Sequence, residues 1–437
     1  MPCRCYIVPP HLLRGIAESS HNPEHIRSAA QASLAAHERV IGLRKERLAS
    51  LTTPRGFRGG QSVNFRPQHI IPDTLLRHVV ESDLVDEVTR TRAKRDLEHL
   101  QQVLGKVRDL QQGQDSPQQV LNAATDEAKD SPKDAPYRAI HDAKNSMNEG
   151  DLPGKLIRAE GEGKVKDKAV NEAYDNVGIV LGFYKKYFKW NSIDNKNVDV
   201  ISTVHFGKRY ENAFWDPERL QMVFGDGGEF LNNFTGCIDV IGHELTHAVT
   251  EHTSPLDYYG QSGALNEHIS DVFGIMIKQK VQDERSAVAD WLIGEDCILP
   301  GVKGTALRSM KAPGTAYDDP RFGKDPQAAH MKQFKTTFED NGGVHIYSGI
   351  PNRAFYLASV AFGGYSWEKA GKIWWDAIKS GKVPPKCTFK QFADVTIDSA
   401  RELFGDAAAK KVKKAWTDVG VTRQATDSSS STWCNIA

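Results

Sequence analysis

Two histidines and a glutamate at helical spacing form the most informative pattern in the chain. Residues 243–247 read His-Glu-Leu-Thr-His, and side chains four apart share a helix face, so His243 and His247 can bind one metal ion. A catalytic zinc ion has three protein ligands and one water molecule, and it favours imidazole nitrogen. Glu267, with 19 residues between it and His247, can be the third ligand. Glu244 can take a proton from the water. The pattern predicts the hydrolysis of amide bonds.

The neighbours of this motif favour a metal site over a chance match. The pentapeptide on its own can also be a helix with two surface histidines, so the surrounding residues decide. They are apolar, which predicts a largely buried helix whose polar groups need partners or a bound ion. These apolar neighbours are Ile238, Val240, Ile241, Leu245, Ala248 and Val249.

The segment around Glu267 is also predicted to be a helix. Glu267 and Asp271 are four residues apart, so both can face the first helix. Asp271 can then accept the second N–H of a zinc-bound histidine and fix its tautomer, and Asn266 can do the same for the other histidine. The alternative is a solvated acidic face. The apolar residues at three-to-four spacing are Leu265, Ile269, Val272 and Phe273.

The elements that must position these residues fall into two groups. Residues 137–230 read mainly as strands and turns, whereas the chain after the motif is mostly helical. We therefore expect an α+β fold in which a β-rich lobe (136–255) and a helical lobe (256–425) flank the motif helix, with a substrate site between them. Candidate strands are 139–142, 156–158 and 198–206; candidate helices are 169–188, 351–362, 367–378, one from a capping box at Thr388 and Gln391 to Gly405, and 407–419.

The first 135 residues differ from the rest in composition. They contain two candidate helices, at 25–51 and 84–110, and then a stretch from 112 to 136 rich in Gln, Asp, Lys and Ser, which is typical of a linker. The second helix has an apolar stripe of Leu97, Leu100, Leu104 and Val107. We expect a helical leader with a linker here, and a loose tail at 426–437.

Length and charge narrow the setting. A chain of 437 residues forms more than one domain, and its net charge of zero gives no reason to expect nucleic acid or a membrane surface as partner. No apolar run approaches the roughly 20 residues that span a bilayer, and the first ten residues lack the apolar core of a secretory signal. The six cysteines are scattered, at 3, 5, 237, 297, 387 and 434, which suits a reduced intracellular chain at least as well as a secreted one.

A resemblance extends the prediction beyond the motif. His243–His247 together with Gly263–Glu267 resemble the thermolysin family of zinc metallopeptidases, and the likeness covers roughly residues 136–425. It implies a two-lobed zincin fold, one catalytic zinc ion, peptide or protein substrates, a monomer, and secretion. Further matching stretches, in the family's order, are Thr203–Gly207, Asn212–Trp215, Met222–Gly227, Leu307–Met310 and Asn341–Ile350.

The resemblance also implies roles for individual residues. His345 and Tyr258 match the donors that stabilise the tetrahedral oxyanion, and Asp340 matches the carboxylate that orients the histidine. Without the family match, His345 could be a surface residue in a Gly-rich turn and Arg308 an ordinary ion pair. The substrate-binding residues implied are Arg308 for the substrate carbonyl, Asn212 and Ala213 for its backbone, and Phe230, Val240 and Leu307 for a bulky apolar side chain on the amine side of the bond.

One departure from the family concerns calcium. Asp239, Asp290 and Glu295 match a carboxylate cluster that binds calcium beside the zinc site, but Lys278 and Leu292 stand where acidic ligands are expected. Because Ca²⁺ needs many oxygen ligands, the loss of two weakens the site. The hypothesis is that the Lys278 ammonium replaces the ion.

The leader is similar to the short propeptide of the protealysin-like branch, on the stretch Pro9-Pro10-His11-Leu12-Leu13. There the propeptide blocks the active site and is removed by self-cleavage. This leader is longer, and its second helix has no counterpart that the resemblance places; a permanent helical extension is the alternative. A thiolate of Cys3 or Cys5 could also occupy the open zinc position, although both can be ordinary free thiols.

Together these patterns predict the precursor of a zinc endopeptidase. A zinc aminopeptidase is one alternative, but that class usually has one residue fewer between its second histidine and its glutamate, and no amine-binding motif is found. A latent peptide-binding protein is another, against which the intact Glu244, Tyr258 and His345 argue. The export route stays open, because cytoplasmic retention and leaderless export both fit the N-terminus.

Overall fold

A six-stranded mixed sheet forms the first part of the catalytic unit. The computed structural model describes residues 5–6, 8–35, 135–216, 219–228, 230–320, 323–338 and 340–423. The strand order is β1-β5-β6-β4-β2-β3, with the pairs β2–β4 and β4–β6 parallel and the other pairs antiparallel. The strands are β1 (Cys5–Tyr6), β2 (Arg138–Asp142), β3 (Lys155–Ala159), β4 (Val200–Val204), β5 (Ala213–Asp216) and β6 (Gln221–Phe224). The three strands predicted from the sequence correspond to β2, β3 and β4.

One long helix covers the sheet. α6 (Lys168–Phe183) begins at Asp167, whose side chain accepts hydrogen bonds from the backbone of Ala169 and Val170, as an N-cap residue does. It packs on β2 and β4 and continues as a π-helical turn, η2 (Tyr184–Phe188). The predicted helix at 169–188 is thus two consecutive elements. Three 3-10 turns are η1 (Glu149–Asp151), η3 (Phe234–Gly236) and η4 (Met331–Gln333).

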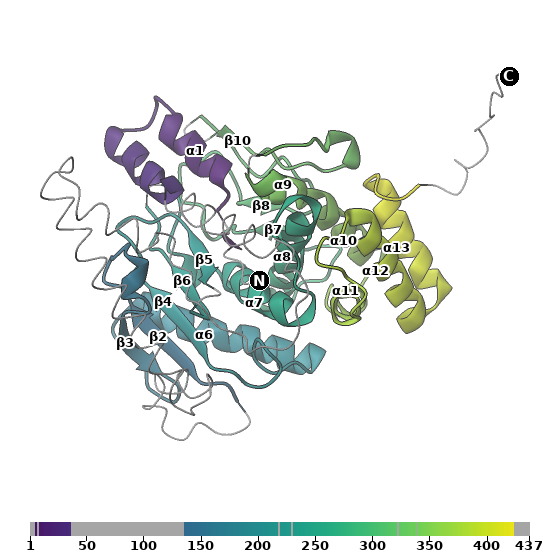
Figure 1. Cartoon of the computed structure of the whole chain (residues 1–437), viewed down its shortest axis with the longest axis horizontal. Coiled ribbons are helices and arrows are strands. Elements are labelled where there is room, and N and C mark those ends of the chain that lie inside the picture. Colours follow the sequence, from purple (N-terminus) through teal and green to yellow (C-terminus); the bar gives the residue numbers. More distant parts are fainter. Residues whose placement is uncertain are drawn as a thin grey trace, which may run out of the picture. The chain divides into compact units, whose positions relative to one another are not determined.

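Two central helices cross at unusually short distance. α7 (Ile238–Thr253) packs against β5 and against α8 (Gly260–Gln282) (Figure 1). A Cβ on Gly274 would lie 2.6 Å from the carbonyl oxygen of Asp239, and one on Gly242 would lie 3.1 Å from the Cα of Gly274. Since both positions are glycine, the two backbones can approach closely. This brings the polar residues of the two helices together.

The rest of the chain is helical around an aromatic core. The capping box at Thr388 and Gln391 is present and opens α12, and Trp374 stacks on Trp416 at a centroid distance of 6.1 Å. The helices are α9 (Asp340–Tyr347), α10 (Gly349–Phe362), α11 (Ala370–Lys379), α12 (Phe389–Phe404) and α13 (Asp406–Asp418). Two small ribbons precede them: β7 (Leu292–Ile293) with β8 (Arg308–Ser309), and β9 (Asp318–Asp319) with β10 (Gly323–Lys324).

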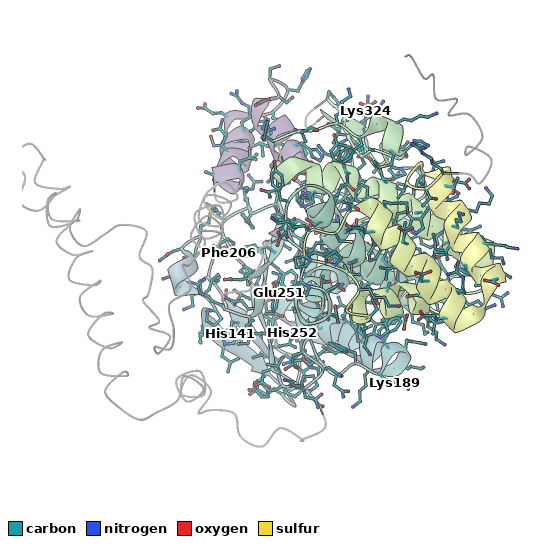
Figure 2. The ribbon with its side chains drawn as sticks, turned by 45° about the vertical axis from the view of Figure 1, so that its right-hand side comes forward. His141, Lys189, Phe206, Glu251, His252 and Lys324 are labelled. Carbon is teal, nitrogen blue, oxygen red and sulfur yellow. The ribbon has the colours of Figure 1, made fainter. Side chains whose placement is uncertain are left out.

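The α+β fold with a sheet-rich part and a helical part is therefore confirmed. In Figure 2 the labelled His141 lies on β2 of the sheet, and Glu251 and His252 mark the last turn of α7. The bounds predicted for the individual domains stay predictions. No helix in the described ranges combines the length and apolar character that crossing a membrane requires.

The start of the leader packs against the catalytic unit. β1 is followed by α1 (Pro10–Glu18) and by a helix at 24–35, where a helix from 25 to 51 is predicted. Val8, Leu12 and Leu13 are fully buried in the same apolar cluster as the catalytic unit. Cys3, the side chain of Cys5, the predicted helix at 84–110, most of the linker and the tail at 426–437 lie outside the described residues.

Candidate metal centre and active site

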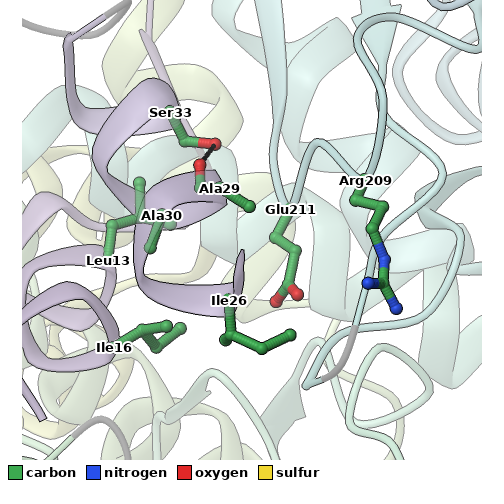
Figure 3. Close-up of a pocket in the computed structure, with 8 residues that line it drawn as sticks. All are labelled: Leu13, Ile16, Ile26, Ala29, Ala30, Ser33, Arg209 and Glu211. Atoms are coloured by element: carbon green, nitrogen blue, oxygen red, sulfur yellow. Dashed lines mark hydrogen bonds between the residues drawn. The ribbon is translucent and has the colours of Figure 1, made fainter. Parts of the chain in front are cut away.

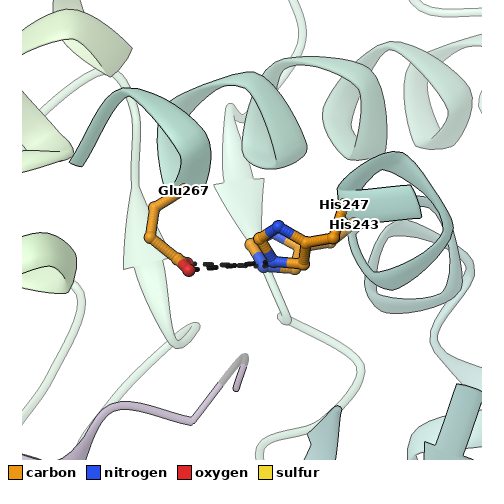
Figure 4. A group of neighbouring side chains, drawn as sticks. All are labelled: His243, His247 and Glu267. Carbon is orange, nitrogen blue, oxygen red and sulfur yellow. Dashed lines mark hydrogen bonds and ion pairs between the residues drawn. The ribbon is translucent and has the colours of Figure 1, made fainter. Parts of the chain in front are cut away.

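The three predicted metal ligands converge. His243 and His247 project from α7 and Glu267 from α8 (Figure 4). The two Nε2 atoms are 3.0 Å apart, and the Glu267 carboxylate oxygens lie 3.4 Å from Nε2 of His243 and 3.7 Å from Nε2 of His247. Tetrahedral zinc with bonds of about 2.0–2.1 Å separates its ligand atoms by about 3.3 Å. The three side chains therefore fit a zinc ion.

The outer nitrogen of each histidine is held by an acceptor. Nδ1 of His243 lies 2.9 Å from Oδ1 of Asp271, and Nδ1 of His247 lies 2.7 Å from Oδ1 of Asn266 and 2.9 Å from Oγ of Ser270. With Nδ1–H donating outward, each Nε2 lone pair points toward the other and toward Glu267. This is the orientation that a metal-bound histidine needs. Asp271 and Asn266 thus lie where the sequence predicted them.

The electrostatics of this centre favour positive charge. Burial opposes the charged form of His243, but hydrogen bonds to Asp271 and Glu267 outweigh it and raise the pKa to about 9. Burial lowers the pKa of the neighbouring His247 to about 3. Burial disfavours the Glu267 carboxylate, yet the surrounding histidines, His345 first, hold its pKa well below the usual range. The proton that this raised pKa keeps on His243 marks the place that a metal ion would take, because the buried Glu267 anion and the two Nε2 atoms together form a donor set for a cation.

Glu244 is poised differently from the other carboxylates. It is completely buried, and neither of its oxygens has a hydrogen bond of good geometry within the described residues, although the backbone of Trp215 lies near enough to lower its pKa somewhat. Burial raises the pKa of Glu244 to about 8. A carboxylate with a raised pKa and unused lone pairs beside a metal centre is suited to accept and return a proton near neutral pH.

Tyr258 and His345 close the other side of the centre. The Tyr258 hydroxyl donates to Oε1 of Glu267 and lies 3.5 Å from Nε2 of His345. Asp340 holds His345 twice: Oδ1 lies 2.7 Å from Nδ1, and Oδ2 accepts from the backbone N–H at 2.8 Å. Burial opposes charge on His345, but Glu267 and Asp340 raise its pKa. His345 is buried rather than a surface residue.

The segment before His345 has an unusual backbone. Four consecutive residues, Asp340, Asn341, Gly342 and Gly343, have φ of 49°, 51°, 82° and 81°. L-residues adopt this left-handed region at a cost, and Asp and Asn tolerate it better than most. The turn directs the Asp340 carboxylate back onto His345.

Arg308 lies in a network that the sequence only partly predicts. Its Nε and Nη2 donate to Asp271 at 2.9 and 2.7 Å, and Asn352 donates to the same carboxylate at 2.9 Å. Arg308 and Asn352 thereby fix the carboxylate that orients His243. The reasoning from sequence missed Asn352 and Ser270; no motif marks them, and only the packing of α10 on α8 reveals Asn352.

Asn212 and Ala213, the residues predicted to bind the substrate backbone, belong to the segment on which the leader is bound. β1 pairs with β5, with Cys5 opposite Trp215 and Tyr6 opposite Phe214. Asn212 accepts from the backbone N–H of Val8 at 2.9 Å and donates to its carbonyl oxygen at 3.1 Å. The remaining predicted residues are buried, Ala213 on β5 and the apolar Phe230, Val240 and Leu307, all in the main core cluster.

The residues of the expected calcium cluster surround a lysine. Nζ of Lys278 donates to Oε2 of Glu295 at 2.8 Å, to the Leu292 carbonyl at 3.1 Å and to Oδ2 of Asp290 at 3.4 Å. Burial lowers the pKa of Lys278, but Asp239 first and then the other carboxylates raise it overall. Asp239 itself is buried and accepts from the backbone of Val240 and Gly294.

Paired helices that bring two histidines, a glutamate and a buried second glutamate together define a zinc-dependent peptidase. Three family models match the chain: "Thermolysin metallopeptidase, catalytic domain" at residues 103–251, "Thermolysin metallopeptidase, alpha-helical domain" at 254–421, and "Protealysin propeptide" at 68–112. The chain belongs to the thermolysin family of metallopeptidases. The propeptide match includes the predicted helix at 84–110, for which the resemblance placed no counterpart.

Known relatives agree with this assignment. An extracellular metalloprotease of Pectobacterium carotovorum subsp. carotovorum is 50% identical over 285 residues, 65% of this chain and 81% of the relative. A thermolysin of Alicyclobacillus acidocaldarius is 40% identical over 62% of this chain and 49% of its own length. The solved precursor of protealysin, a metalloproteinase from Serratia proteamaculans, has a TM-score of 0.64 and 45% identity, and the match covers 81% of this chain and 99% of that one.

Proposed function

We propose that the chain is the precursor of a secreted zinc endopeptidase that its own leader holds latent. One observation carries the catalytic part: the inward-facing Nε2 atoms of His243 and His247 converge with Glu267 next to the buried, unpartnered carboxylate of Glu244. Two relatives that share the fold are named extracellular metalloproteases, which supports export.

His243, His247 and Glu267 would hold the zinc ion, which polarises the substrate carbonyl and lowers the pKa of water. Glu244 then accepts the proton of the attacking water and delivers one to the leaving amine, a role that its pKa of about 8 supports. Tyr258 and His345 donate to the oxygen of the carbonyl as negative charge develops there. Asp340 keeps the His345 ring in position, with its Nε2 toward Glu267.

The substrate backbone is proposed to take the place of β1. An extended peptide that pairs with β5 would find the backbone groups of Phe214 and Trp215 where β1 now pairs, and Asn212 could bind it as it now binds Val8. Arg308 is proposed to contact the substrate carbonyl while its guanidinium stays on Asp271. Phe230, Val240 and Leu307 favour a bulky apolar side chain on the amine side of the bond.

Latency follows from the same pairing, because β1 and Val8 use the groups that a substrate needs. We propose that cleavage within the leader removes this contact. N-terminal sequencing of the purified active protein should find a new terminus near residues 100–138, and an active protein with an intact Met1 terminus would contradict the scheme.

The Lys278 contacts support calcium independence. Its ammonium lies among Asp290, Glu295 and the Leu292 carbonyl, the position in which a Ca²⁺ ion would need those oxygens as ligands. A tightly bound stoichiometric calcium ion that depends on Asp290 would contradict this proposal.

The function is tested with Glu244→Gln on a peptide whose N-terminus is acetylated. The variant should retain one zinc ion per chain by elemental analysis and lose activity at least about 1,000-fold, because the proton acceptor is gone. Cleavage of the blocked peptide by the wild type distinguishes an endopeptidase from an aminopeptidase. A variant that cleaves at the normal rate would contradict the mechanism.

A further inference from the structure

The leader contains the same short sequence twice. Residues 7–19 read Ile-Val-Pro-Pro-His-Leu-Leu-Arg-Gly-Ile-Ala-Glu-Ser, and residues 70–82 read Ile-Ile-Pro-Asp-Thr-Leu-Leu-Arg-His-Val-Val-Glu-Ser. Seven of the thirteen positions are identical, at a constant separation of 63 residues. We name them the first copy (7–19) and the second copy (70–82). The propeptide model matches residues 68–112, so it contains the second copy, whereas the structure describes residues 8–19 of the first.

The first copy is bound by polar contacts at both ends. Val8 exchanges two hydrogen bonds with Asn212, at 2.9 and 3.1 Å. Nε2 of His11 lies 2.9 Å from the Tyr317 hydroxyl, and Oγ of Ser19 donates to the Pro320 carbonyl at 2.8 Å. We call residues 212–216 together with Tyr317 and Pro320 the leader-binding surface. The contacts to Val8 use its backbone, so they do not depend on the side chain at that position.

The side chains that the first copy buries are apolar in both copies at every position but one, since the buried Pro10 corresponds to Asp73. An apolar face of this kind provides most of the binding free energy of a docked helix. The buried residues of the first copy whose equivalents are also apolar are Val8 with Ile71, Pro9 with Pro72, Leu12 with Leu75, Leu13 with Leu76, Ile16 with Val79, and Ala17 with Val80.

The packing around these side chains is close. Between α1, the helix at 24–35 and the Arg209–Glu211 segment, a cavity of only about 10 Å³ remains, lined by Leu13 and Ile16 among others (Figure 3); it has room for about one water molecule. Valine for Ile16 removes one carbon and valine for Ala17 adds two, so the apolar volume nearly balances. Tight sites tolerate such volume-conserving exchanges best.

Two differences weaken the second copy without removing its fit. Asp73 replaces Pro10, the first residue of α1, whose side chain is buried. A carboxylate is costly to bury there, although its place in the first turn of the helix offsets part of that cost. Thr74 replaces His11, and its shorter side chain reaches less far toward the Tyr317 hydroxyl than the imidazole does. We expect the second copy to bind the same surface more weakly than the first.

The chain is long enough for either copy to bind. Residues 83–134, 52 in all, connect the second copy to the part of the catalytic unit that the structure describes from residue 135, and 52 residues can span up to about 170 Å. A tethered ligand has an effective concentration in the millimolar range for short flexible connections, so even a weak second ligand competes when the first is gone.

We infer that the second copy is a second inhibitory ligand for the leader-binding surface. When cleavage between the copies releases the first, residues 71–80 take its place. The active site then opens only after cleavage on the carboxyl side of Ser82. This inference rests on the proposed function, since it concerns how the latent peptidase is opened.

The experiment compares full-length chains that all carry Glu244→Gln, which prevents self-cleavage. Leu12→Asp with Leu13→Asp disables the first copy, Leu75→Asp with Leu76→Asp disables the second, and a third chain carries all four changes. The readout is binding of a fluorescent peptide hydroxamate to the zinc-loaded protein. Gln31→Asp, at an exposed leader position, is the control for added charge. This chain should bind the probe as weakly as the chain whose leader is unaltered.

Each chain with one copy disabled should bind the probe at least about tenfold more weakly than the chain with both disabled, since one ligand still covers the site. A first-copy variant that binds the probe as tightly as the fourfold variant would overturn the inference.

A direct binding measurement with peptides is independent of peptidase activity. It also does not depend on how a chain with only one disabled copy folds. A labelled peptide of residues 68–82 should bind the fourfold variant, and an unlabelled peptide of residues 5–19 should displace it. The 68–82 peptide with Leu75→Asp and Leu76→Asp should bind at least about tenfold more weakly, because two buried leucines are lost. The inference would be overturned if the 68–82 peptide and its Leu75→Asp, Leu76→Asp form bound equally well, or if the 5–19 peptide did not displace the 68–82 peptide. A fourfold variant with Glu244 restored that binds the peptide but cleaves nothing would contradict only the proposed function.

Discussion

The zinc centre and the Lys278 cluster solve the same electrostatic problem in opposite ways. Each gathers carboxylates beside α8 and includes one that is fully buried, Glu267 at the zinc centre and Asp239 near Lys278, where an uncompensated charge is expensive. At Lys278 the counter-charge belongs to the chain, 2.8 Å from Glu295. At Glu267 the counter-charge must come from outside the chain, and the histidines around it keep their lone pairs inward. A lysine as counter-charge makes the structure of its cluster independent of metal ions in solution. A metal ion as counter-charge supplies catalytic chemistry, but the site then depends on the metal concentration.

The largest expected effect is the loss of activity when the zinc ion is removed. Removing zinc with 1,10-phenanthroline should reduce activity of the processed enzyme at least about 1,000-fold, because zinc supplies several kcal/mol of transition-state stabilisation. The calcium chelator EGTA, at a concentration that leaves zinc bound, should change activity and thermal stability little. A loss of stability with EGTA would break the comparison, since the Lys278 cluster would then also depend on an ion.

The next largest effect is the loss of stability when the Lys278 ammonium is removed. Lys278→Met should lower the free energy of unfolding by about 3 kcal/mol, because it leaves the buried Asp239 without a counter-charge, whereas the partly exposed Asp290 and Glu295 add little. Denaturant unfolding measures the change, and Lys382→Met is the control, since Lys382 pairs with Glu402 on the exposed surface. If calcium restores the stability of a Lys278→Asp protein, the comparison is sharpened. If Lys278→Met is as stable as the wild type, the comparison fails.

A smaller effect is expected at the helix crossing that the two sites share. An added Cβ at Gly274 would lie 2.6 Å from the Asp239 carbonyl, so Gly274→Ala should push α7 from α8. Overpacking of this kind costs about 1–3 kcal/mol, and zinc affinity should fall along with stability. Gly182→Ala, within α6, where nothing lies within 4 Å of an added Cβ, controls for the loss of a helical glycine. Unchanged zinc affinity in a less stable Gly274→Ala protein would show that the crossing does not set the ligand geometry.

The smallest effect concerns a counter-charge that titrates. His205 lies 2.8 Å from Asp226 and 2.9 Å from Asp167, and the hydrogen bond to Asp226 is the main reason that its pKa is raised to about 9. Its charged form therefore stabilises the fold fully below about pH 6.5 and loses this effect as the pH rises through about 9. Because both carboxylates are partly exposed, we expect a contribution of only about 1 kcal/mol.

His205→Asn tests this contribution, since Asn tolerates the left-handed backbone of that residue, φ 56°. The difference in unfolding free energy between wild type and variant should be largest below pH 6.5 and vanish above pH 10. A difference that does not change with pH would assign the stabilisation to packing.

The sequence predicted the parts of the site that depend on local spacing. His243 and His247 are one turn apart, and Asp271 lies one turn beyond Glu267, so both pairs follow from helix geometry alone. His345 and Asp340 came from resemblance, because a turn of four left-handed residues has no periodic signal. Asn352 was missed, since its contact with Asp271 exists only through the packing of α10 on α8. The two-residue β1, about 200 residues from β5, is likewise a product of tertiary structure.

The covered edge of β5 has a consequence for the behaviour of the protein in solution. β1 is the edge strand of the sheet, so release of the leader turns β5 into an edge with unpaired N–H and C=O groups along Phe214 and Trp215. Such an edge pairs with any extended chain, including another molecule of the same protein. The property that admits a substrate is therefore also an aggregation hazard. We therefore expect the precursor to stay soluble at high concentration, and a form without the leader to aggregate there unless a substrate or inhibitor covers β5.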